Sequence, residues 1–546
     1  MKEIKRPNKP INEKIGEAVD KVIGIVNPQA GYRRAAFRRA TGFVSGFRNR
    51  ISAGSYRGAE KSRLRADWMP GAGSPDQDIL PELQDLRDRS RDLNRNDGTA
   101  TGITNTIVVN DIGTGIKPQS RIDKESLEIT DAATIRFQKA AERVWEKWVP
   151  FADAGNRMDF YELQALVDRQ VLENGEIILL PLMIKEVGRP YSLVFDLIEA
   201  DRLATPMDLK SDKSIRDGVK IGDRGEPLSY WIRKTHPGEM KYRDFKKSTS
   251  FIEIPAKNKA GRINVIHLYH VLRPGQTRGV PFFAPVLTYF KDMADYLEAE
   301  IIAARIAACF SIFITKTGDA SDVALARTSE TNAAGQRLEY VEPGVIEHLA
   351  QGEDIHAFEP KRPGDNFDPF INRVLRIISA ALNLPYEIVA KDFSQTNYSS
   401  ARAALLEARR YFRMRQEWLA KKFCQPAWNM LLEEAWLRGE LPAAGFYENF
   451  LDWTRARWIT PGWSWVDPVK EVIASQKAVD MGISSLADEA AAQGKDYEEV
   501  LEQRAREEVK IKELEEKNGI IIKTRSGKAD NITIVDNGGK DDEKDK

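Results

Sequence analysis

The spacing of apolar residues predicts two long helices in the second half of the chain. Apolar side chains recur three or four residues apart after Pro285 and again after Asp368, which is the period of one helix face. Pro285 and Pro369 suit the first turn of a helix, and Asp368 suits the N-cap. We therefore expect helices over 285–310, about 39 Å long at 1.5 Å per residue, and over 368–383.

The helical pattern continues toward the C-terminus. Ser399 or Ser400 is the expected N-cap of a basic helix that ends near Cys424, where Pro426 should break it. Beyond it the pattern predicts more helical segments, at 428–437 and, increasingly acidic, at 470–517.

The first half of the chain alternates between helix and strand patterns. Leucines at helical spacing predict a helix over 80–93, and runs of β-branched residues predict strands at 107–109, 176–180, 193–197 and 263–271. Gly113 and Gly115 follow the first of these strands, but Pro118 stands where a dinucleotide fingerprint needs its third glycine, so we interpret them as a tight turn. The fold class is a mixed α+β body with long helices.

Length and charge narrow the possible functions. A chain of 546 residues exceeds one ordinary core, so two to four sub-domains are expected. Its 82 basic and 82 acidic side chains cancel, which argues against a tight nucleic-acid binder, because each neutralised phosphate needs a lysine or arginine. Neutrality is compatible with a protein through which DNA passes. Residues 33–65 hold ten basic residues against Glu60, and either phosphates or an acidic neighbouring subunit would suit them.

The sequence offers no pattern for enzyme chemistry, so we expect no catalytic residues, no cofactor and no metal. It lacks the phosphate-binding loop of nucleotide motors and the nucleophile elbow of hydrolases. His267 and His270 lie in an expected strand, three residues apart, and so should face opposite sides. Cys309 and Cys424 cannot build a disulfide scaffold. No segment reads as a signal peptide or bilayer span, so no membrane partner is expected.

Two landmarks point to a family. The first lies within 273–281 and comprises Pro274, Gly275, Gln276, Arg278, Gly279 and Pro281, directly before a long helix. The second comprises Asn397, Tyr398, Ser399, Ser400 and Arg402, after a loop that begins at Lys391. With the stretches 87–96 and 108–116, their order and spacing resemble the lambda-type portal proteins (head–tail connectors) of tailed phages.

The resemblance implies a ring, typically of twelve subunits, at one vertex of the capsid around a channel for double-stranded DNA. It implies a portal-type fold, with the following parts: 1–30 a flexible arm, 31–284 the first part of the wing, 285–310 a stem helix, 311–367 the clip, 368–384 a second stem helix, 385–398 the tunnel loop, 399–469 the second part of the wing, 470–520 the crown and 521–546 a disordered tail.

The tunnel loop would face DNA in that arrangement, through Lys391, Asp392, Ser394, Gln395, Thr396 and Asn397. A ring repeats each side chain at many azimuths, so one lysine becomes a belt of positive charge that contacts phosphates without reading bases. From the sequence alone, this segment is an ordinary surface loop before a helix cap, and only the resemblance favours the channel.

The resemblance also implies partners and a location. Packaging energy would come from a separate ATPase, the large terminase subunit, which would dock on the clip and later give way to a head–tail completion protein. Major capsid and scaffold proteins would surround the ring, in the virion and, during assembly, in the host cytoplasm. Two alternatives stay open: another virion structural protein, such as a minor capsid or adaptor component, and, more remotely, a DNA-processing enzyme suggested by the basic segments 33–65 and 402–422.

Overall fold

The structure is a computed structural model that describes residues 71–239, 250–308, 312–316, 353–357, 367–463 and 467–518. The chain separates into two compact units, Met1–Gly73 and Ser74–Lys546, and every element named below belongs to the second. The expected arm, the basic segment 33–65, most of the expected clip and the C-terminal tail lie outside the described residues. No helix in the described ranges is long and apolar enough to cross a membrane.

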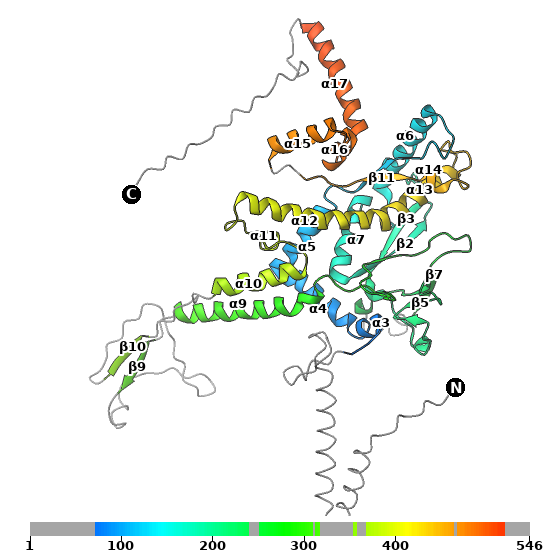
Figure 1. Cartoon of the computed structure of the whole chain (residues 1–546). Helices are drawn as coiled ribbons and strands as arrows, with labels where there is room; N and C mark the ends of the chain where they lie inside the picture. Colours follow the sequence, from blue (N-terminus) through cyan, green and yellow to red (C-terminus); the bar gives the residue numbers. More distant parts are fainter. Residues whose placement is uncertain are drawn as a thin grey trace, which may run out of the picture. The chain divides into compact units, whose positions relative to one another are not determined.

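Helices and short sheets together form the described part of the chain, which confirms the mixed α+β class (Figure 1). The α-helices are α3 (Pro75–Ile79), α4 (Leu83–Asn96), α5 (Gly98–Asp111), α6 (Asp131–Trp148), α7 (Phe160–Asn174), α9 (Leu287–Ala308), α10 (Phe367–Ala381), α11 (Tyr386–Ala390), α12 (Tyr398–Leu419), α13 (Gln425–Leu437), α14 (Phe450–Trp453), α15 (Pro468–Asp480), α16 (Leu486–Ala492) and α17 (Tyr497–Asn518). The strands are β1 (Lys117–Ser120), β2 (Glu176–Met183), β3 (Leu193–Ile198), β4 (Ile215–Arg216), β5 (Val219–Ile221), β6 (Pro227–Arg233), β7 (Phe251–Pro255), β8 (Ile266–Tyr269), β9 (Ile312–Lys316), β10 (Glu353–Ala357) and β11 (Ala456–Ile459).

The strands form four small antiparallel sheets. One has the order β3-β2-β8 and another the order β4-β5-β6-β7, while β1 pairs with β11 and β9 with β10. In the first sheet Ile178 of the central strand lies opposite both Ile198 and His267. The β1–β11 pair places Lys117 opposite Ile459, so segments far apart in the sequence belong to one body.

Aromatic side chains fill the largest core. Trp148 is fully buried, and its ring lies 5.0 Å from the rings of both Trp145 and Phe160. Its indole N–H donates to the carbonyl of Leu193 at 2.7 Å, which satisfies the one polar group of that side chain. Trp428 of α13 packs on the same cluster, so this core joins α6, α7, α13 and the β2 sheet.

The two expected long helices are present and lie against each other. Tyr296 of α9 stacks on Phe367 at 5.7 Å and meets Phe370 of α10 edge-on at 5.1 Å. The first helix begins with a 3-10 turn, Ala284–Val286. Asp368, expected as the N-cap of the second, lies inside the first turn of α10 instead.

The expected strand at 107–109 is wrong, because these residues belong to α5. The side chain of Asp97 caps this helix by accepting the N–H of Ala100 at 2.8 Å. Ile103 and Ile107 are buried in the core beside α9 and α10, and such packing overrides the strand preference of β-branched residues. The tight turn after it is confirmed, with Gly113 at a φ of +48°.

Two expectations for the basic helix are also wrong. Asn397, rather than Ser399 or Ser400, is the N-cap of α12, since its side chain accepts the N–H of Ser400 at 2.8 Å. Pro426 does not break the helix: α12 passes through a π turn, Ala420–Cys424, directly into α13. Proline is tolerated in the first turn of a helical segment, and the π turn resets the hydrogen-bond register just before it.

Candidate functional site

The motif at 273–281 folds as a turn that leads into α9. Gly275 adopts a φ of +84°, which favours glycine. The side-chain amide of Gln276 closes the turn: its oxygen accepts the N–H of Leu272 at 2.8 Å and its nitrogen donates to the carbonyl of Arg278 at 2.7 Å. The N–H of Thr277 donates to Asp76, at 2.9 Å, so the turn is also fixed to α3.

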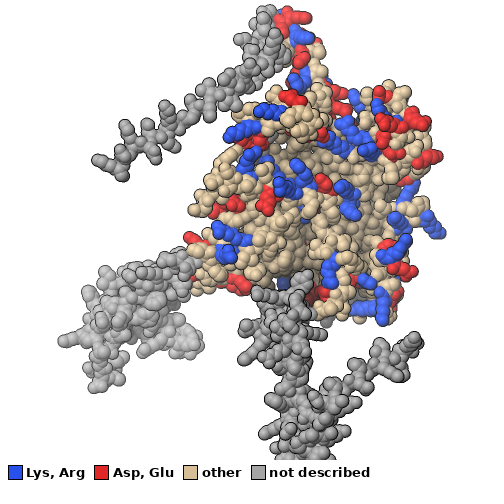
Figure 2. Space-filling model, in the orientation of Figure 1, with Lys and Arg blue, Asp and Glu red and all other residues tan. Residues whose placement is uncertain are grey.

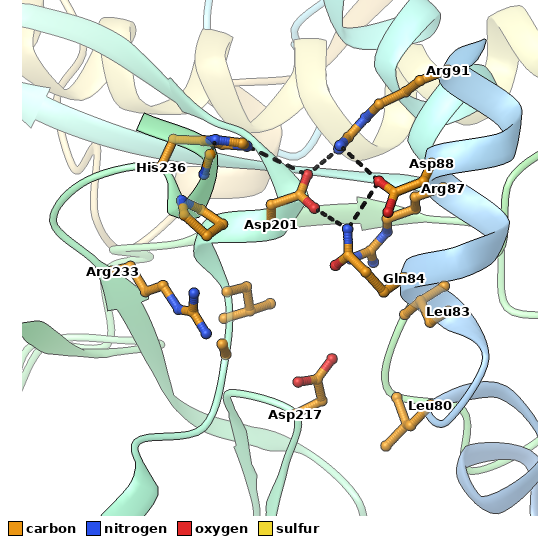
Figure 3. Close-up of a pocket in the computed structure, with 14 residues that line it drawn as sticks. Leu80, Leu83, Gln84, Arg87, Asp88, Arg91, Asp201, Asp217, Arg233 and His236 are labelled. Atoms are coloured by element: carbon orange, nitrogen blue, oxygen red, sulfur yellow. Dashed lines mark hydrogen bonds and ion pairs between the residues drawn. The ribbon is translucent and has the colours of Figure 1, made fainter. Parts of the chain in front are cut away.

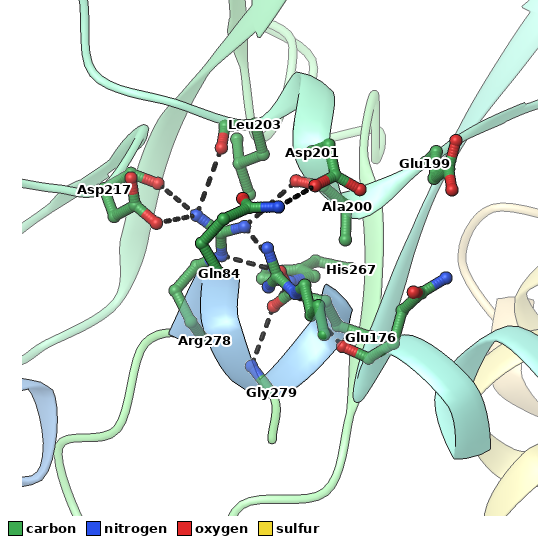
Figure 4. A network of polar contacts seen from close by, with 12 residues as sticks. Gln84, Glu176, Glu199, Ala200, Asp201, Leu203, Asp217, His267, Arg278 and Gly279 are labelled. Carbon is green, nitrogen blue, oxygen red and sulfur yellow. Dashed lines mark hydrogen bonds and ion pairs between the residues drawn. The ribbon is translucent and has the colours of Figure 1, made fainter. Parts of the chain in front are cut away.

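Arg278 of this motif lies at the centre of a buried ion network (Figure 4). Its guanidinium forms an ion pair of 2.6 Å with Glu176 and another of 2.6 Å with Asp217. Glu176, at the start of β2, also accepts from Arg87 of α4 and from His267 at 3.0 Å. Helix α4, strands β2 and β8, and the turn before α9 are thereby tied to one carboxylate.

The electrostatics of this network depend on two arginines facing one glutamate. Burial alone would raise the pKa of Glu176, but the charges of Arg278 and Arg87 outweigh it and hold that pKa well below its usual range. A carbonyl adds support, since Arg278 donates to Ala200 at 3.1 Å. The carboxylate is therefore ionised at neutral pH and holds two cations that are both buried.

Close backbone packing accompanies the network. The N–H of Gly279 donates to Glu176 at 2.7 Å. A Cβ at Gly279 would lie 2.1 Å from the carbonyl oxygen of Gly175, and one at Gly175 would lie 2.4 Å from the backbone of Val280. Both positions therefore require glycine. Because Arg278 is fully buried, its side chain anchors the turn before the long helix and is not on the surface.

The loop at 391–398 has the opposite character. Lys391 ends α11 in the left-handed region, at a φ of +53°, and is exposed. Asp392 accepts the N–H of Ser394 at 2.9 Å, Thr396 donates to the carbonyl of Phe393 at 2.9 Å, and Asn397 caps α12. The loop is thus shaped by bonds within itself.

The charged atoms of the loop stay in contact with solvent. Asp392 carries a lowered pKa because the hydroxyl and backbone N–H of Ser394 both bind its carboxylate, so it is ionised beside Lys391. Ser394, Gln395 and Asn397 are exposed. The described structure thus separates the two landmarks: one is a buried anchor, the other a surface loop over α5, where the Lys391 side chain lies near Gly102.

The family model for lambda-family phage portal proteins matches residues 61–416, more than half of the chain and both landmarks. The chain belongs to this family. Among curated proteins, the portal protein of Escherichia phage N15 is 25% identical over 81% of this chain and 87% of its own length. Portal protein B of Escherichia phage lambda is also 25% identical, over 81% of this chain and 86% of its own length.

Solved structures give a weaker overall likeness. A chain in the neck of a native gene transfer agent particle, computed with C12 symmetry, is 15% identical and has a TM-score of 0.41, with 76% of this chain and 92% of that chain covered. The family match and the curated relatives give this chain the function of a portal protein.

One pocket of the portal body is lined by Asp201 and His236 (Figure 3), which together with the nearby Glu199 form a group that could hold a metal ion. The ligand atoms of Glu199, Asp201 and His236 all lie within 4.8 Å of one another. Arg91, however, forms ion pairs with Asp201 and, at 3.3 Å, with Glu199. His236 accepts the N–H of Gly238 at Nδ1, and its Nε2 lies 3.5 Å from Glu199. The guanidinium already supplies the cation, and the residues do not fit a metal.

The two neighbouring histidines have separate surroundings. His267 pairs with Glu176, as described above. His270 follows the end of β8 and packs against Trp418, with the two ring centroids 4.2 Å apart and the planes tilted by 33°. Burial and the charge of Arg415 lower the pKa of His270 to about 4. It is neutral at physiological pH and packs as an aromatic ring.

Sequence reasoning did not find the partners of Arg278. Glu176 opens a strand recognised only by its apolar run, and Asp217 occupies a turn, so nothing local marks either as a partner. The stretch 87–96 did carry a signal, because Arg87 and Arg91 stand four residues apart and reach Glu176 and Asp201. A pair of arginines at helical spacing predicts one charged face, but not what it meets.

Proposed function

We propose that this portal protein forms a closed ring, of about twelve copies by family resemblance, at one capsid vertex, where double-stranded DNA enters and leaves. The observation that carries the proposal is the family match over 61–416, which covers the anchor turn, both long helices and the loop in one order. Net charge zero supports it further, because strong attraction to phosphates would oppose the movement of DNA.

The elements suit the parts of a portal subunit. Helices α9 and α10 are the stem, and their aromatic contact supports a paired arrangement. The hairpin β9–β10, in which Ile355 lies opposite Ile314, is the described part of the clip. The body around Trp148, with α12 and α13, is the wing, and α15–α17 are the crown. In this assignment the buried anchor at Arg278 holds the stem on the wing.

The loop at 391–398 is the channel loop in this proposal. Lys391 and Asp392 cancel within each copy, so a ring presents alternating charges rather than a uniformly positive belt. Contacts with phosphates are then weak and independent of sequence. Replacing 391–397 with glycine and serine should preserve the ring and impair DNA packaging or retention. Normal infectious particles from that variant would remove the assignment.

The partners follow from the same proposal. The large terminase subunit supplies ATP hydrolysis and docks on the clip, and a head–tail completion protein later takes its place, while capsid and scaffold proteins surround the wing. Chimeras that exchange 316–364 should exchange terminase or completion-protein preference. Unchanged partner choice would count against the clip assignment.

Electron microscopy of the purified protein tests the ring itself. We expect closed rings with about twelve-fold symmetry and a central hole wide enough for duplex DNA. Particles that stay monomeric with scaffold and capsid protein present would favour the alternative of a minor capsid or adaptor component. Metal-dependent DNA cleavage would favour the enzyme alternative.

A further inference from the structure

The helices α15–α17 contribute no residue to the buried hydrophobic clusters of the described chain. None of the described side chains between 467 and 517 is buried. Apolar residues such as Met481, Ile483 and Leu486 are 72%, 74% and 56% exposed. Hydrophobic burial therefore contributes little to holding these helices on the body of the same chain.

Complementary charges, rather than hydrophobic burial, hold α15–α17 on the body. Four ion pairs join the body to these helices, and in each the base lies on the body and the acid on α15–α17. They are Arg402–Glu471 at 3.7 Å, Arg457–Asp488 at 2.9 Å, Arg121–Glu498 at 3.3 Å and Lys139–Glu502 at 2.8 Å. Gln119 of β1 adds a hydrogen bond to Asp496 at 2.6 Å.

A close backbone contact also fixes the position of α15–α17 on the body, beside these ion pairs. Gly462 lies against the end of α16, where a Cβ would fall 2.2 Å from the carbonyl carbon of Gln493. Trp463, the next residue, donates to Asn110 at 2.9 Å and has Arg409 over its ring at 5.7 Å. Trp463 thus packs on α5 and α12.

We propose that α15–α17 form a detachable module, docked on the body through a patch of ion pairs around the Gly462–Gln493 contact and released when those charges are screened. We call these four ion pairs, with Gln119 and Gly462, the docking patch. Each pair is partly exposed, and exposed pairs are individually weak. A surface held by several weak pairs without a core separates without unfolding the body, and helices that have no buried side chains open more readily once they are undocked. This inference concerns one chain and stands whether or not the ring is confirmed.

One acidic side chain on the body opposes docking of α15–α17. Glu142 of α6 accepts the N–H of Ser120 at 2.8 Å, and burial, together with the nearby charges of Asp496 and Glu498, raises its pKa to about 7. Docking brings those two acids toward Glu142, so the docked form favours the protonated group. Docking should therefore weaken as pH rises through about 7. The other titratable groups around it are Lys117, Arg121, Lys139, Glu146, Glu499 and Glu502.

Hydrogen–deuterium exchange of the full-length protein tests the module, with α15–α17 compared against the core helix α7. We expect exchange in α15–α17 to rise severalfold in 1 M NaCl, where the screening length is about 3 Å, while exchange in α7 is unchanged.

Gly462→Ala should raise exchange in α15–α17 by about tenfold, because overpacking against the backbone forces a shift. Gly98→Ala is the control, because its Cβ meets nothing within 4 Å. Unchanged exchange in Gly462→Ala, or no response to salt, would overturn the proposal.

Reversing the charges of one ion pair provides a second test, which is needed if the Gly462→Ala variant fails to fold. Lys139→Glu should increase exchange in α15–α17 roughly two- to fivefold, the effect of one exposed pair, and adding Glu502→Lys should restore it. Glu142→Gln keeps the acceptor for Ser120 and should remove the pH dependence. If the double variant exchanges as fast as the single one, the pairs do not hold the module.

Discussion

Arg278 and Lys391 are both cations in segments that carry the family resemblance, yet their surroundings are opposite. Arg278 has no exposure and meets two carboxylates and several carbonyls, whereas Lys391 is exposed at the end of a short helix. A buried charge without partners costs several kcal/mol, so the first residue allows almost no substitution. A surface lysine is replaceable for folding. In the proposed ring, any requirement for Lys391 would therefore come from what the loop contacts there and not from folding of the chain.

The largest effect should follow from breaking the buried anchor. Glu176→Gln leaves Arg278 and Arg87 buried beside a neutral group, so we expect a loss of about 3–5 kcal/mol, measured as a lower thermal midpoint and a smaller yield of rings. Because the pKa of Glu176 is held below its usual range, its stabilising effect is present above the ordinary carboxyl value and disappears as pH falls through the lowered one.

Glu186→Gln is the matched control. Glu186 pairs with Arg189 at 2.7 Å, but its side chain is 59% exposed. Arg189, which is 4% exposed, also donates to three backbone carbonyls, so loss of the Glu186 charge should leave the thermal midpoint nearly unchanged. If Glu176→Gln and Glu186→Gln have the same thermal midpoint, the buried network contributes no more to stability than the exposed Glu186 does. The contrast with Lys391 then disappears.

A second buried network has more acidic than basic members, whereas in the Glu176 network two arginines face one glutamate. Arg415 pairs with Asp111 and Asp168, each at 2.6 Å, so two carboxylates face one arginine. Burial and the charge of Asp168 raise the pKa of Asp111 well above its usual value, although Arg415 opposes the shift. The two networks therefore shift their acids in opposite directions: the pKa of Glu176 is lowered and that of Asp111 is raised.

The sign of its pH effect is opposite to that of Glu176. Asp111 binds its proton more tightly in the folded protein, so stability is greatest below the unfolded pKa of about 4 and falls by about 1.4 kcal/mol per pH unit until the raised pKa is passed. Asp111→Asn imitates the protonated acid and should flatten the thermal midpoint between pH 5 and 8. Asp168→Asn should also reduce the slope, because it removes the neighbouring charge that helps to raise the pKa of Asp111. An unchanged slope in Asp111→Asn would contradict the raised pKa of Asp111.

Much of the fold could be predicted from the sequence where the signal is local. The apolar periods of α9 and α10 and the strands at 176–180 and 193–197 are such cases. The expectation failed at Ile107, where tertiary packing makes a β-branched run helical, and at Pro426, where a π turn admits a proline. The ion networks could not be predicted, since Arg278 and Glu176 are 102 residues apart and no local pattern pairs them. Channel-facing side chains need a second copy of the chain to be defined.

The smallest expected effect comes from substitutions of Lys391, which separate its backbone role at the end of α11 from the role of its charge. Its φ of +53° is unfavourable for a lysine, so Lys391→Gly should raise stability by about 1 kcal/mol while it removes the charge. Lys391→Arg retains both the charge and the strained backbone. If the loop acts on DNA through this charge, the glycine variant melts higher but packages or retains DNA poorly, and the arginine variant matches the natural protein in both. A glycine variant with normal DNA retention would leave Lys391 only a helix-ending role, and the channel contact would then have to come from the polar residues 394–397.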